Sequence, residues 1–456
     1  MKKERGIKKL KHQARRYSIK EGIFASAKSA FGDKFIQPFA IAINTSSPLV
    51  ALISSLSGFL GPLSQLFSAQ KLGKKSRKKT VLFFILLETL MWIPFILTAI
   101  LFSKGIITGI LPLLLLLSFS VYIIISNAVY PHWFSWMGDL VDEKYRGKWF
   151  SKRNLLVGIT SVVLSIISAF LLDYFKQLNA AMIGFVILFS AALICRFISF
   201  FIFKKQYEPK LKFKKENYFS FWSFIKKAPE NNFGKFTIFR SLFAFAGAVS
   251  SALWSVYLLR YLGFSYGIYM VILVSEAAFS LVLVELWGKL ADKYGNYKIL
   301  IITTMFLPLS PLLWVLHSSP IYLIFVPALV TGIFWGGFAL ACSNFIYDNV
   351  SKQKRSLGVS YYNMMWGIGV SVGAGLSALL IKYLPIWIFE PIISIFIIST
   401  ILRMIVVAWW IPKLKEVRET KKLSTRNLRK AIVKQIKPTL VEEAHQISSI
   451  GNYLRK

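Results

Sequence analysis

Hydrophobic residues along the chain fall into long continuous runs that are separated by short polar connections. Because a helix needs about 20 mostly apolar residues to cross a bilayer, the pattern predicts twelve membrane-spanning helices, six in each half of the chain. In the first half we expect helices at residues 22–44, 48–70, 80–103, 106–132, 154–176 and 178–203. In the second half we expect them at residues 236–261, 264–287, 298–316, 320–346, 358–383 and 386–411. The first of these runs is the least hydrophobic.

Basic residues gather in alternate connections between the predicted helices. The connections after the second, fourth, sixth, eighth and tenth helices hold most of the lysine and arginine, whereas the others and their edges hold only Lys104, Lys176, Arg260 and Lys382. By the positive-inside rule, the basic connections and both termini face the cytoplasm. An even number of helices follows, and we expect a multi-pass protein of the cell (cytoplasmic) membrane.

The charge pattern also predicts the domain organisation. We expect a basic cytoplasmic N-terminus at residues 1–21, a six-helix bundle at 22–203, a cytoplasmic linker at 204–235, a second six-helix bundle at 236–412 and a basic cytoplasmic tail at 413–456. The linker surrounds aromatic residues such as Trp222 and Phe224 with charges, which predicts an amphipathic segment on the membrane surface. For the tail, contact with anionic lipid is the simpler interpretation, and a dedicated partner is the alternative.

Composition supports the membrane class. The chain has 456 residues, of which 55% are hydrophobic, and its mean hydropathy of +0.56 is too high for a soluble protein of this length. A net charge of +36 would suggest nucleic acid in a soluble protein, but here the charge lies in loops and tails, so we expect no nucleic-acid partner. Cys195 and Cys342 both lie in apolar runs, which predicts neither a disulfide nor a cysteine metal site. We expect no cleaved signal peptide and no cofactor.

The two halves of the chain contain similar segments at equivalent places. With one offset of 209 residues, GDLVDEKYRGKWFSKRNLLVGI after the fourth helix aligns with YDNVSKQKRSLGVSYYNMMWGI after the tenth, so that Asp139 matches Asp348 and Arg146 matches Arg355. A second pair, AQKLGKK and ADKYGNY, follows the second and the eighth helices. Two matched loops in each half indicate an internal duplication, which is common among transporters.

The loop after the eighth helix resembles a loop of a known family. The segment GKLADKYGNYK at residues 288–298 is similar to the signature loop of the major facilitator superfamily, usually written G-x-L-a-D-r-x-G-r-k. The first-half copy is degraded, with Gln70 in place of the acid and Leu66 in place of the first glycine. The resemblance covers the chain to about residue 412. It implies an all-α membrane protein with twelve transmembrane helices in two pseudo-symmetric six-helix bundles.

In the resembled family this loop latches the two halves together on the cytoplasmic side. A carboxylate such as Asp292 can accept hydrogen bonds from a neighbouring helix start, where the helix dipole is positive. Gly288 and Gly295 would permit close approach and a tight turn. The alternative is a solvated turn. The residues implied for this cytoplasmic latch are Gly288, Asp292, Lys293, Gly295, Asp139, Arg146, Gly147, Asp348 and Arg355.

Small residues recur on two helices that meet across the halves in the resembled fold. Helix 48–70 carries Ser54, Ser57, Gly58 and Gly61, and helix 358–383 is rich in glycine, including Gly367. Small side chains allow helix backbones to approach closely in lipid. These faces are suited to sliding or, equally, to tight static packing.

A polar stripe marks the first helix. Ser26, Ser29, Asp33, Gln37 and Asn44 recur at helical spacing, and the stripe is centred on Asp33. At 1.5 Å per residue Asp33 lies about 16 Å into the helix, close to the membrane midplane. Ionisable groups at this depth are costly and usually functional, so Asp33 is our first candidate for a proton or cation site. The alternative is a structural ion pair with Lys34 or another lysine.

Other ionisable residues interrupt the apolar runs. Glu276, near the middle of the eighth helix, is the second candidate, and a structural hydrogen bond is its alternative role. We interpret Glu88 and Glu390 as structural, because their helices are peripheral in the resembled fold. Lys34 requires a nearby partner such as Asp33, Glu88 or Glu276. Four further cations are predicted to extend to the cytoplasmic surface: Lys28, Arg196, Arg240 and Arg403.

Amide and aromatic residues complete the predicted substrate site. Helices that line the cavity in the resembled family contribute Asn127, Tyr130, Trp254, Trp335, Asn344, Tyr361, Tyr362 and Trp366. Such groups suit a neutral or amphipathic organic solute, although core packing is the alternative role for each aromatic ring. The sequence does not separate sugar, amino-acid, drug and phosphate-ester carriers.

The function that these patterns favour is secondary transport of a small organic solute by alternating access, driven by a proton or a sodium ion. A non-transporting sensor or scaffold on the same fold is one alternative. A membrane-embedded enzyme acting on lipids is another, but His12, His132, His317 and His445 are scattered and no catalytic motif accompanies them. We therefore expect a transporter and not an enzyme.

Overall fold

The computed structural model describes residues 2–71, 76–141, 146–209, 220–351, 354–386 and 389–417, and within these ranges every regular element is a helix. The first half contains α1 (Lys2–Phe31), η1 (Asp33–Phe35), α2 (Ile36–Ala42), α3 (Ser47–Ala69), α4 (Arg77–Leu90), α5 (Trp92–Ser103), α6 (Leu111–Leu140), α7 (Arg146–Gln177) and α8 (Ala181–Lys204).

The second half begins with the linker helix α9 (Phe221–Lys227) and η3 (Ala228–Glu230). It continues with α10 (Asn232–Ser251), η4 (Val256–Tyr261), α11 (Tyr266–Val282), α12 (Val284–Tyr294), α13 (Asn296–Phe306), η5 (Leu307–Leu309), α14 (Ser310–Val315), α15 (Pro320–Leu323), η6 (Ile324–Ala328), α16 (Leu329–Asn349), α17 (Arg355–Tyr383), α18 (Pro391–Trp410) and η7 (Ile411–Lys413). In the linker Phe224 is buried and Trp222 is 77% exposed, so the segment is amphipathic.

Among the described residues, eleven helical spans are long and apolar enough to cross a membrane, and they correspond to the last eleven predicted helices. The remaining predicted helix, 22–44, consists of the end of α1, the short η1 and α2. It carries Lys28, Asp33 and Lys34 inside the span, which explains its low hydrophobicity. A helix with these charges needs protein partners in place of lipid.

Contacts divide the chain into two compact units that cut across the two halves of the sequence. Unit 1 contains Met1–Glu216, Ser251–Met270 and Gly367–Pro385, and unit 2 contains Asn217–Ser250, Val271–Trp366 and Ile386–Lys456. Unit 1 therefore joins the first half to η4, the start of α11 and the end of α17. The boundary at the linker 204–235 stays a prediction, because it refers to bundles in sequence order.

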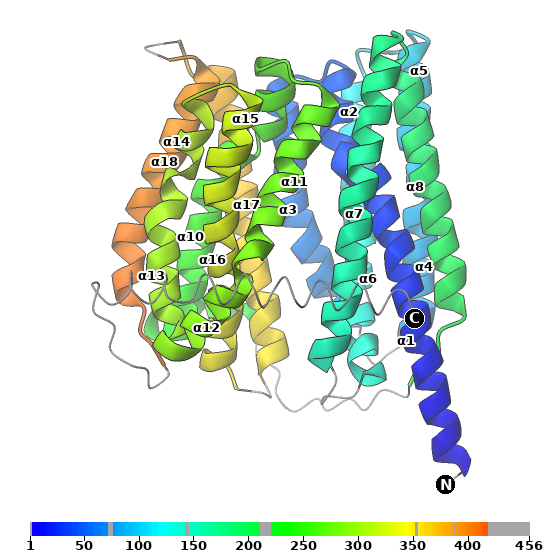
Figure 1. Ribbon diagram of the computed structural model, residues 1–456, viewed down its shortest axis with the longest axis vertical. Coiled ribbons are helices and arrows are strands. Elements are labelled where there is room, and N and C mark those ends of the chain that lie inside the picture. The colour runs from blue at the N-terminus through cyan, green and yellow to red at the C-terminus, as the bar shows by residue number, and fades with distance from the viewer. Residues whose placement is uncertain are drawn as a thin grey trace. The chain divides into compact units, whose positions relative to one another are not determined.

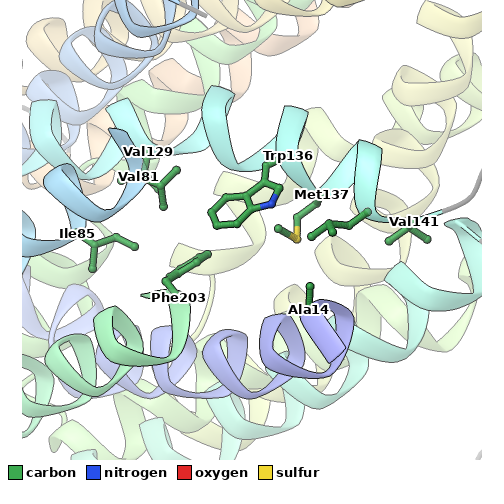
Figure 2. Close-up of a cluster of buried hydrophobic side chains, with 9 residues drawn as sticks. Ala14, Val81, Ile85, Val129, Trp136, Met137, Val141 and Phe203 are labelled. Carbon is green, nitrogen blue, oxygen red and sulfur yellow. The ribbon is translucent and has the colours of Figure 1, made fainter. Parts of the chain in front are cut away.

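The core of unit 1 forms where α1 packs against α7 and α8, and α4 packs against α6 and α8 (Figure 1). Figure 2 shows one apolar cluster of this core, in which Trp136, Phe203 and Ala14 converge from α6, α8 and α1. Val141, which directly follows α6, belongs to the same cluster. The early turns of α1 therefore lie beside the end of α6.

Carboxylates surround the start of the third helix of each half in the same way. In unit 1, Glu208 accepts the backbone N–H of Arg77 at 2.8 Å, and Asp139 accepts Arg77 Nη1 at 2.6 Å. In unit 2, Glu416 accepts the backbone N–H of Tyr297 at 2.9 Å, and Asp348 accepts Asn296 Nδ2 at 2.7 Å. An acid at a helix start satisfies amides that lack intrahelical partners and complements the dipole. The sequence repeat that pairs Asp139 with Asp348 thus has a structural counterpart.

We expect Glu208→Ala to destabilise unit 1 by about 1–2 kcal/mol, the usual cost of losing a helix cap. The change removes the acceptor of both the Arg77 N–H and the Ser76 hydroxyl, which lies 2.5 Å from Glu208 Oε2. Chemical unfolding in detergent micelles measures the loss. The exposed Glu230 provides a control: Glu230→Ala leaves the free energy of unfolding within experimental error. An equal effect of the two substitutions would contradict the capping role.

Candidate functional site

A chain of buried charges runs through the core of unit 1. Lys28 Nζ on α1 lies 2.9 Å from Asp33 Oδ2, 3.0 Å from Glu88 Oε1 and 3.0 Å from the Tyr122 hydroxyl. Tyr122 on α6 in turn donates to the other oxygen of Asp33. A lysine, a tyrosine and two carboxylates from α1, η1, α4 and α6 therefore form one hydrogen-bonded group.

The chain continues from Glu88 to α8 and back to α1. Arg196 donates to Glu88 through Nε at 2.9 Å and through Nη2, so both bonds go to the same carboxylate. Arg196 Nη1 also lies 3.8 Å from Glu21 Oε1, and Arg153 Nη2 lies 3.4 Å from Glu21 Oε2. We call the sequence Asp33, Lys28, Glu88, Arg196, Glu21 and Arg153 the charge chain. Its three acids and three bases alternate, so it is neutral when every group is ionised.

Burial differs along the charge chain. The Glu88 side chain is 2% exposed and the Lys28 side chain 9%, whereas that of Asp33 is 32% exposed. Ions buried this deeply survive only when each has a partner of opposite charge. Asp33 is thus the most exposed member of the charge chain.

The break in the first helix places Asp33. The α-helix ends at Phe31, and η1 turns the chain before α2 continues. Gly32 lies against the ring of Trp92, and a Cβ at this position would come within 2.6 Å of a ring carbon. Only glycine fits this contact without moving the tryptophan. The turn brings the Asp33 carboxylate back to Lys28, five residues earlier in the sequence.

A cavity of about 370 Å³ lies beside the charge chain. Its volume falls within the range of small-molecule sites, about 300–1,000 Å³. The lining residues come from α1, α3, α4, α6, α7 and α8 and are Glu21, Ala25, Lys28, Gln65, Glu88, Ser126, Asn127, Val129, Tyr130, Trp133, Arg153, Arg196 and Phe203. The cavity therefore combines five ionisable groups with amides and aromatic rings.

The stripe predicted on the first helix is only partly assembled. Asp33 pairs with Lys28, which agrees with the ion pair left open as its alternative role. Lys34 donates to Ser165 Oγ at 2.9 Å. Gln37 donates to Ser54 Oγ at 2.9 Å and accepts from Ser255 Oγ at 2.8 Å. Asn44 is exposed in the turn after α2, with φ of 61°, so it caps the helix end and does not extend the stripe.

Two of the predicted cavity residues line the cavity of unit 1. Asn127 accepts Gln65 Nε2 at 2.8 Å and donates to the Ile123 carbonyl at 3.0 Å. Tyr130 is 49% exposed and stacks on Phe134. Asn127 and Tyr130 therefore present polar atoms and a ring to the same space.

The prediction that four cations extend to the cytoplasmic surface is wrong. Lys28, Arg196, Arg240 and Arg403 are each at least nine-tenths buried and are bound inside the protein. Arg403, for example, donates to Ser310 Oγ at 2.9 Å and to the Leu307 carbonyl at 3.1 Å. Glu88 joins Lys28 to Arg196 by buried ion pairs, which agrees with the structural role predicted for it.

The other predicted residues lie in several different environments. Trp335 and Tyr362 meet around Arg240 in unit 2. Glu276 on α11 is half-buried and interacts electrostatically with Arg403. Trp254 and Asn344 are half-buried, on the segment between α10 and η4 and on α16 respectively. Tyr361 is 1% exposed and packs against Phe221 and Phe224 of the linker, so it has a packing role and does not line a cavity.

The latch residues are only partly described. Gly295 separates α12 from α13 with φ of 93°, which agrees with the predicted tight turn. A Cβ at Gly288 would lie 3.9 Å from Leu340, so no close approach requires glycine there. Lys293 lies 5.1 Å from the ring of Tyr294, and Asp139 and Asp348 hold the starts of α4 and α13. The side chains of Arg146 and Arg355 lie outside the described part of the structure, as does any partnership with Asp292.

Unit 1 also contains contacts that join the two halves of the sequence. Asp173 at the end of α7 accepts the backbone N–H groups of Tyr266 and Gly267, both at 2.7 Å, at the start of α11. Arg260 in η4 donates to the Thr45 carbonyl at 2.6 Å and to Ser47 Oγ at 2.9 Å. We call these four hydrogen bonds the outer contacts, because they lie at the end of unit 1 away from Ala14 and Val141.

Small residues allow α3 and α17 to approach each other closely within unit 1. A Cβ at Gly58 of α3 would lie 2.9 Å from the backbone nitrogen of Ser371 on α17, and Ser55 Oγ donates to the Ser371 carbonyl at 2.9 Å. The predicted close approach of these two small-residue helices is therefore present in unit 1. Sequence reasoning identified the glycines but missed Asp173 and Arg260, because residues at helix ends look like ordinary surface groups.

Comparison with known proteins assigns the fold. Residues 236–441 match the model of the Major Facilitator Superfamily. This match covers less than half of the chain. The all-α membrane fold that the sequence predicted is confirmed, and the match agrees with the predicted transporter class. No curated protein matches the sequence significantly.

Solved structures of transporters share the fold at low sequence identity. A variant of the nucleoside transporter NupG is 13% identical with a TM-score of 0.63, covering 89% of this chain and 100% of its own. A bacterial homologue of the iron transporter ferroportin is 13% identical with a TM-score of 0.65, covering 87% and 98%. A bacterial homologue of the human lysosomal transporter Spinster is 13% identical with a TM-score of 0.62, covering 88% and 96%.

Proposed function

We propose that this protein is a member of the Major Facilitator Superfamily, that it moves a small organic solute across the cell membrane by alternating access and that Asp33 carries a coupling proton. The charge chain supports the proposal, because its most exposed carboxylate lies at the break in the first helix. A group at such a break couples a change of charge to a change of backbone direction.

The coupling follows from the neutrality of the charge chain. A proton on Asp33 removes one negative charge and leaves Lys28 with Glu88 as its remaining carboxylate partner. Tyr122 then loses an ionised acceptor, so both bonds that hold η1 to α1 and α6 weaken together. Charge-assisted hydrogen bonds are about twice as strong as neutral ones, so protonation frees the break to change its angle.

Alternating access also requires contacts that close one side of the transporter, and the outer contacts are suited to this role. In transport by this mechanism, access to a fixed binding site closes on one side of the membrane while it opens on the other. We take the end of unit 1 at which α4 begins with Arg77, Lys78 and Lys79 as cytoplasmic, in keeping with the positive-inside rule, and the end with Asp173 and Arg260 as external. These contacts would close the external side and must break when it opens.

The proposal is tested by comparing wild type with Asp33→Asn. A thermal-shift screen of the wild type against metabolites and drugs identifies a solute, since a ligand of the folded state raises the melting temperature. In proteoliposomes we expect an imposed pH gradient to drive uptake of that solute by the wild type. In Asp33→Asn we expect solute exchange to persist and gradient-driven accumulation to fall at least about tenfold, because an amide does not titrate.

Glu390→Gln provides the matched control. Glu390 precedes α18 and is exposed, so the same loss of one carboxylate should leave coupled uptake unchanged. Proton-driven accumulation by Asp33→Asn equal to that of the wild type would exclude Asp33 as the coupling group. Absence of flux for every solute that binds would instead favour a sensor or scaffold on this fold.

A further inference from the structure

Unit 2 contains a buried arginine that has no acidic partner among the residues that the structure describes. Arg240 on α10 is 9% exposed, and its Nε donates to the Tyr362 hydroxyl at 3.1 Å. Its Nη1 is fully buried and makes no hydrogen bond with the described part of the protein. None of the ion pairs among the described residues includes Arg240.

The other buried arginines show how unusual this environment is. Arg196 has two carboxylates within 4.0 Å, and Arg77 has Asp139 at 2.6 Å. Arg403 has no carboxylate at salt-bridge distance, but its two terminal nitrogens reach carbonyl and hydroxyl oxygens. An ionised group buried without such compensation is costly, so Arg240 keeps its position at the expense of stability.

Aromatic rings surround the guanidinium. Its carbon lies 5.5 Å from the ring centre of Trp335, 5.2 Å from that of Phe338 and 5.8 Å from that of Trp366. Ring faces attract a cation, but they satisfy none of its N–H donors. Trp335 and Trp366 are each 37% exposed, so the ring cluster around Arg240 extends to the protein surface.

We propose that Arg240 binds the carboxylate or phosphate group of the transported solute, with the two tryptophans packing against its apolar part. This inference rests on the proposed transport function and restricts the solute to an organic anion with a flat or ring-shaped body. A guanidinium presents paired N–H donors that match the oxygens of a carboxylate or a phosphate. The unpaired Nη1 supplies the bond that the protein itself leaves unmade.

The first test needs no ligand and compares one substitution at two buried arginines. We expect Arg240→Gln to melt at the same temperature as the wild type or above it, because an uncompensated charge is removed. We expect Arg196→Gln to melt well below the wild type, because Glu88 and Glu21 lose their partner. A large loss of melting temperature in Arg240→Gln would show that the protein already compensates this charge, and the proposal would be overturned.

The second test measures binding by the purified protein in a neutral detergent. We expect benzoate and phenyl phosphate to raise the melting temperature and to quench tryptophan fluorescence, and uncharged benzamide to do neither. In Arg240→Gln the apparent affinity for both anions should fall at least tenfold, and Arg240→Lys should retain part of it. Anion binding that is unchanged in Arg240→Gln, or absent from the wild type, would refute the proposal.

A phospholipid headgroup also carries a phosphate, so a third experiment repeats the binding measurement in mixed micelles that contain phosphatidylglycerol. If the lipid displaces the two anions in the wild type, the anion site belongs to lipid and the solute proposal fails. Glu390→Gln serves as the reference and should bind benzoate like the wild type. Gradient-driven accumulation reports on Asp33 and anion binding reports on Arg240, so the failure of either proposal gives a different result.

Discussion

Replacing Glu88 with alanine is expected to lower the free energy of unfolding by about 3–5 kcal/mol, the cost of breaking a buried ion pair by removing one partner. Glu88 is 1% exposed, and it is the carboxylate shared by Lys28 at 3.0 Å and Arg196. Its loss leaves Arg196 with the more distant Glu21 and leaves Lys28 dependent on Asp33 alone. Two cations then remain in the core with one carboxylate fewer, which no local rearrangement compensates.

Chemical unfolding in detergent micelles measures this loss, with two comparisons. Glu390→Ala removes an exposed carboxylate and should change the free energy of unfolding by less than about 0.5 kcal/mol. The double variant Glu88→Met with Arg196→Met removes both charges of the pair and should be markedly more stable than Glu88→Ala. If Glu88→Ala were as stable as the wild type, the charge chain would contribute nothing to the fold.

The sequence predicted the helices well because their signal is local. Eleven spans of bilayer length stand out as apolar runs, and helix ends follow from nearby charges. The twelfth was harder to identify, because Lys28, Asp33 and Lys34 reduce its hydrophobicity and their partners lie far away in sequence. Tyr122 and Ser165, which contact Lys28 and Lys34, are more than 90 residues from them and look like ordinary members of apolar runs.

The pairing of charges could not be predicted either, because the partners lie far apart in the sequence. Glu21, Lys28, Glu88, Arg153 and Arg196 are each visible as charges at or within helices, but one residue near a helix end can extend to the surface or turn inward. Which of these happens depends on the facing helix. Pseudo-symmetry was easier to detect, since Asp139 and Asp348 hold equivalent helix starts in the two units.

The outer contacts are expected to control the equilibrium between the conformation with a closed external end and the one with an open external end. We expect Asp173→Asn to favour opening of the external end by about 10- to 100-fold, because one of the two backbone N–H groups at the start of α11 loses its charged acceptor. Hydrogen bonds to charged groups contribute about 1.5–3 kcal/mol, and 1.4 kcal/mol is a factor of about ten. A Cβ at Gly267 would lie 2.8 Å from Asp173 Oδ2, so Gly267→Ala should act in the same direction by displacing the carboxylate.

Thiol labelling measures the opening of this end. Ser255 is 1% exposed and donates to Gln37, so Ser255→Cys, in a chain whose Cys195 and Cys342 are replaced by alanine, reports access to the buried segment behind the outer contacts. A membrane-impermeant maleimide applied outside intact cells should label it slowly, and Asp173→Asn should raise the rate at least about fivefold if labelling follows the population of the open form. Asp139→Asn, at the opposite end of unit 1, should leave the rate unchanged or lower it. Equal labelling rates in all three backgrounds would mean that the hydrogen bonds of Asp173 hold the start of α11 in place without controlling access. Closure of the external end would then depend on the backbone contact between Gly58 and Ser371.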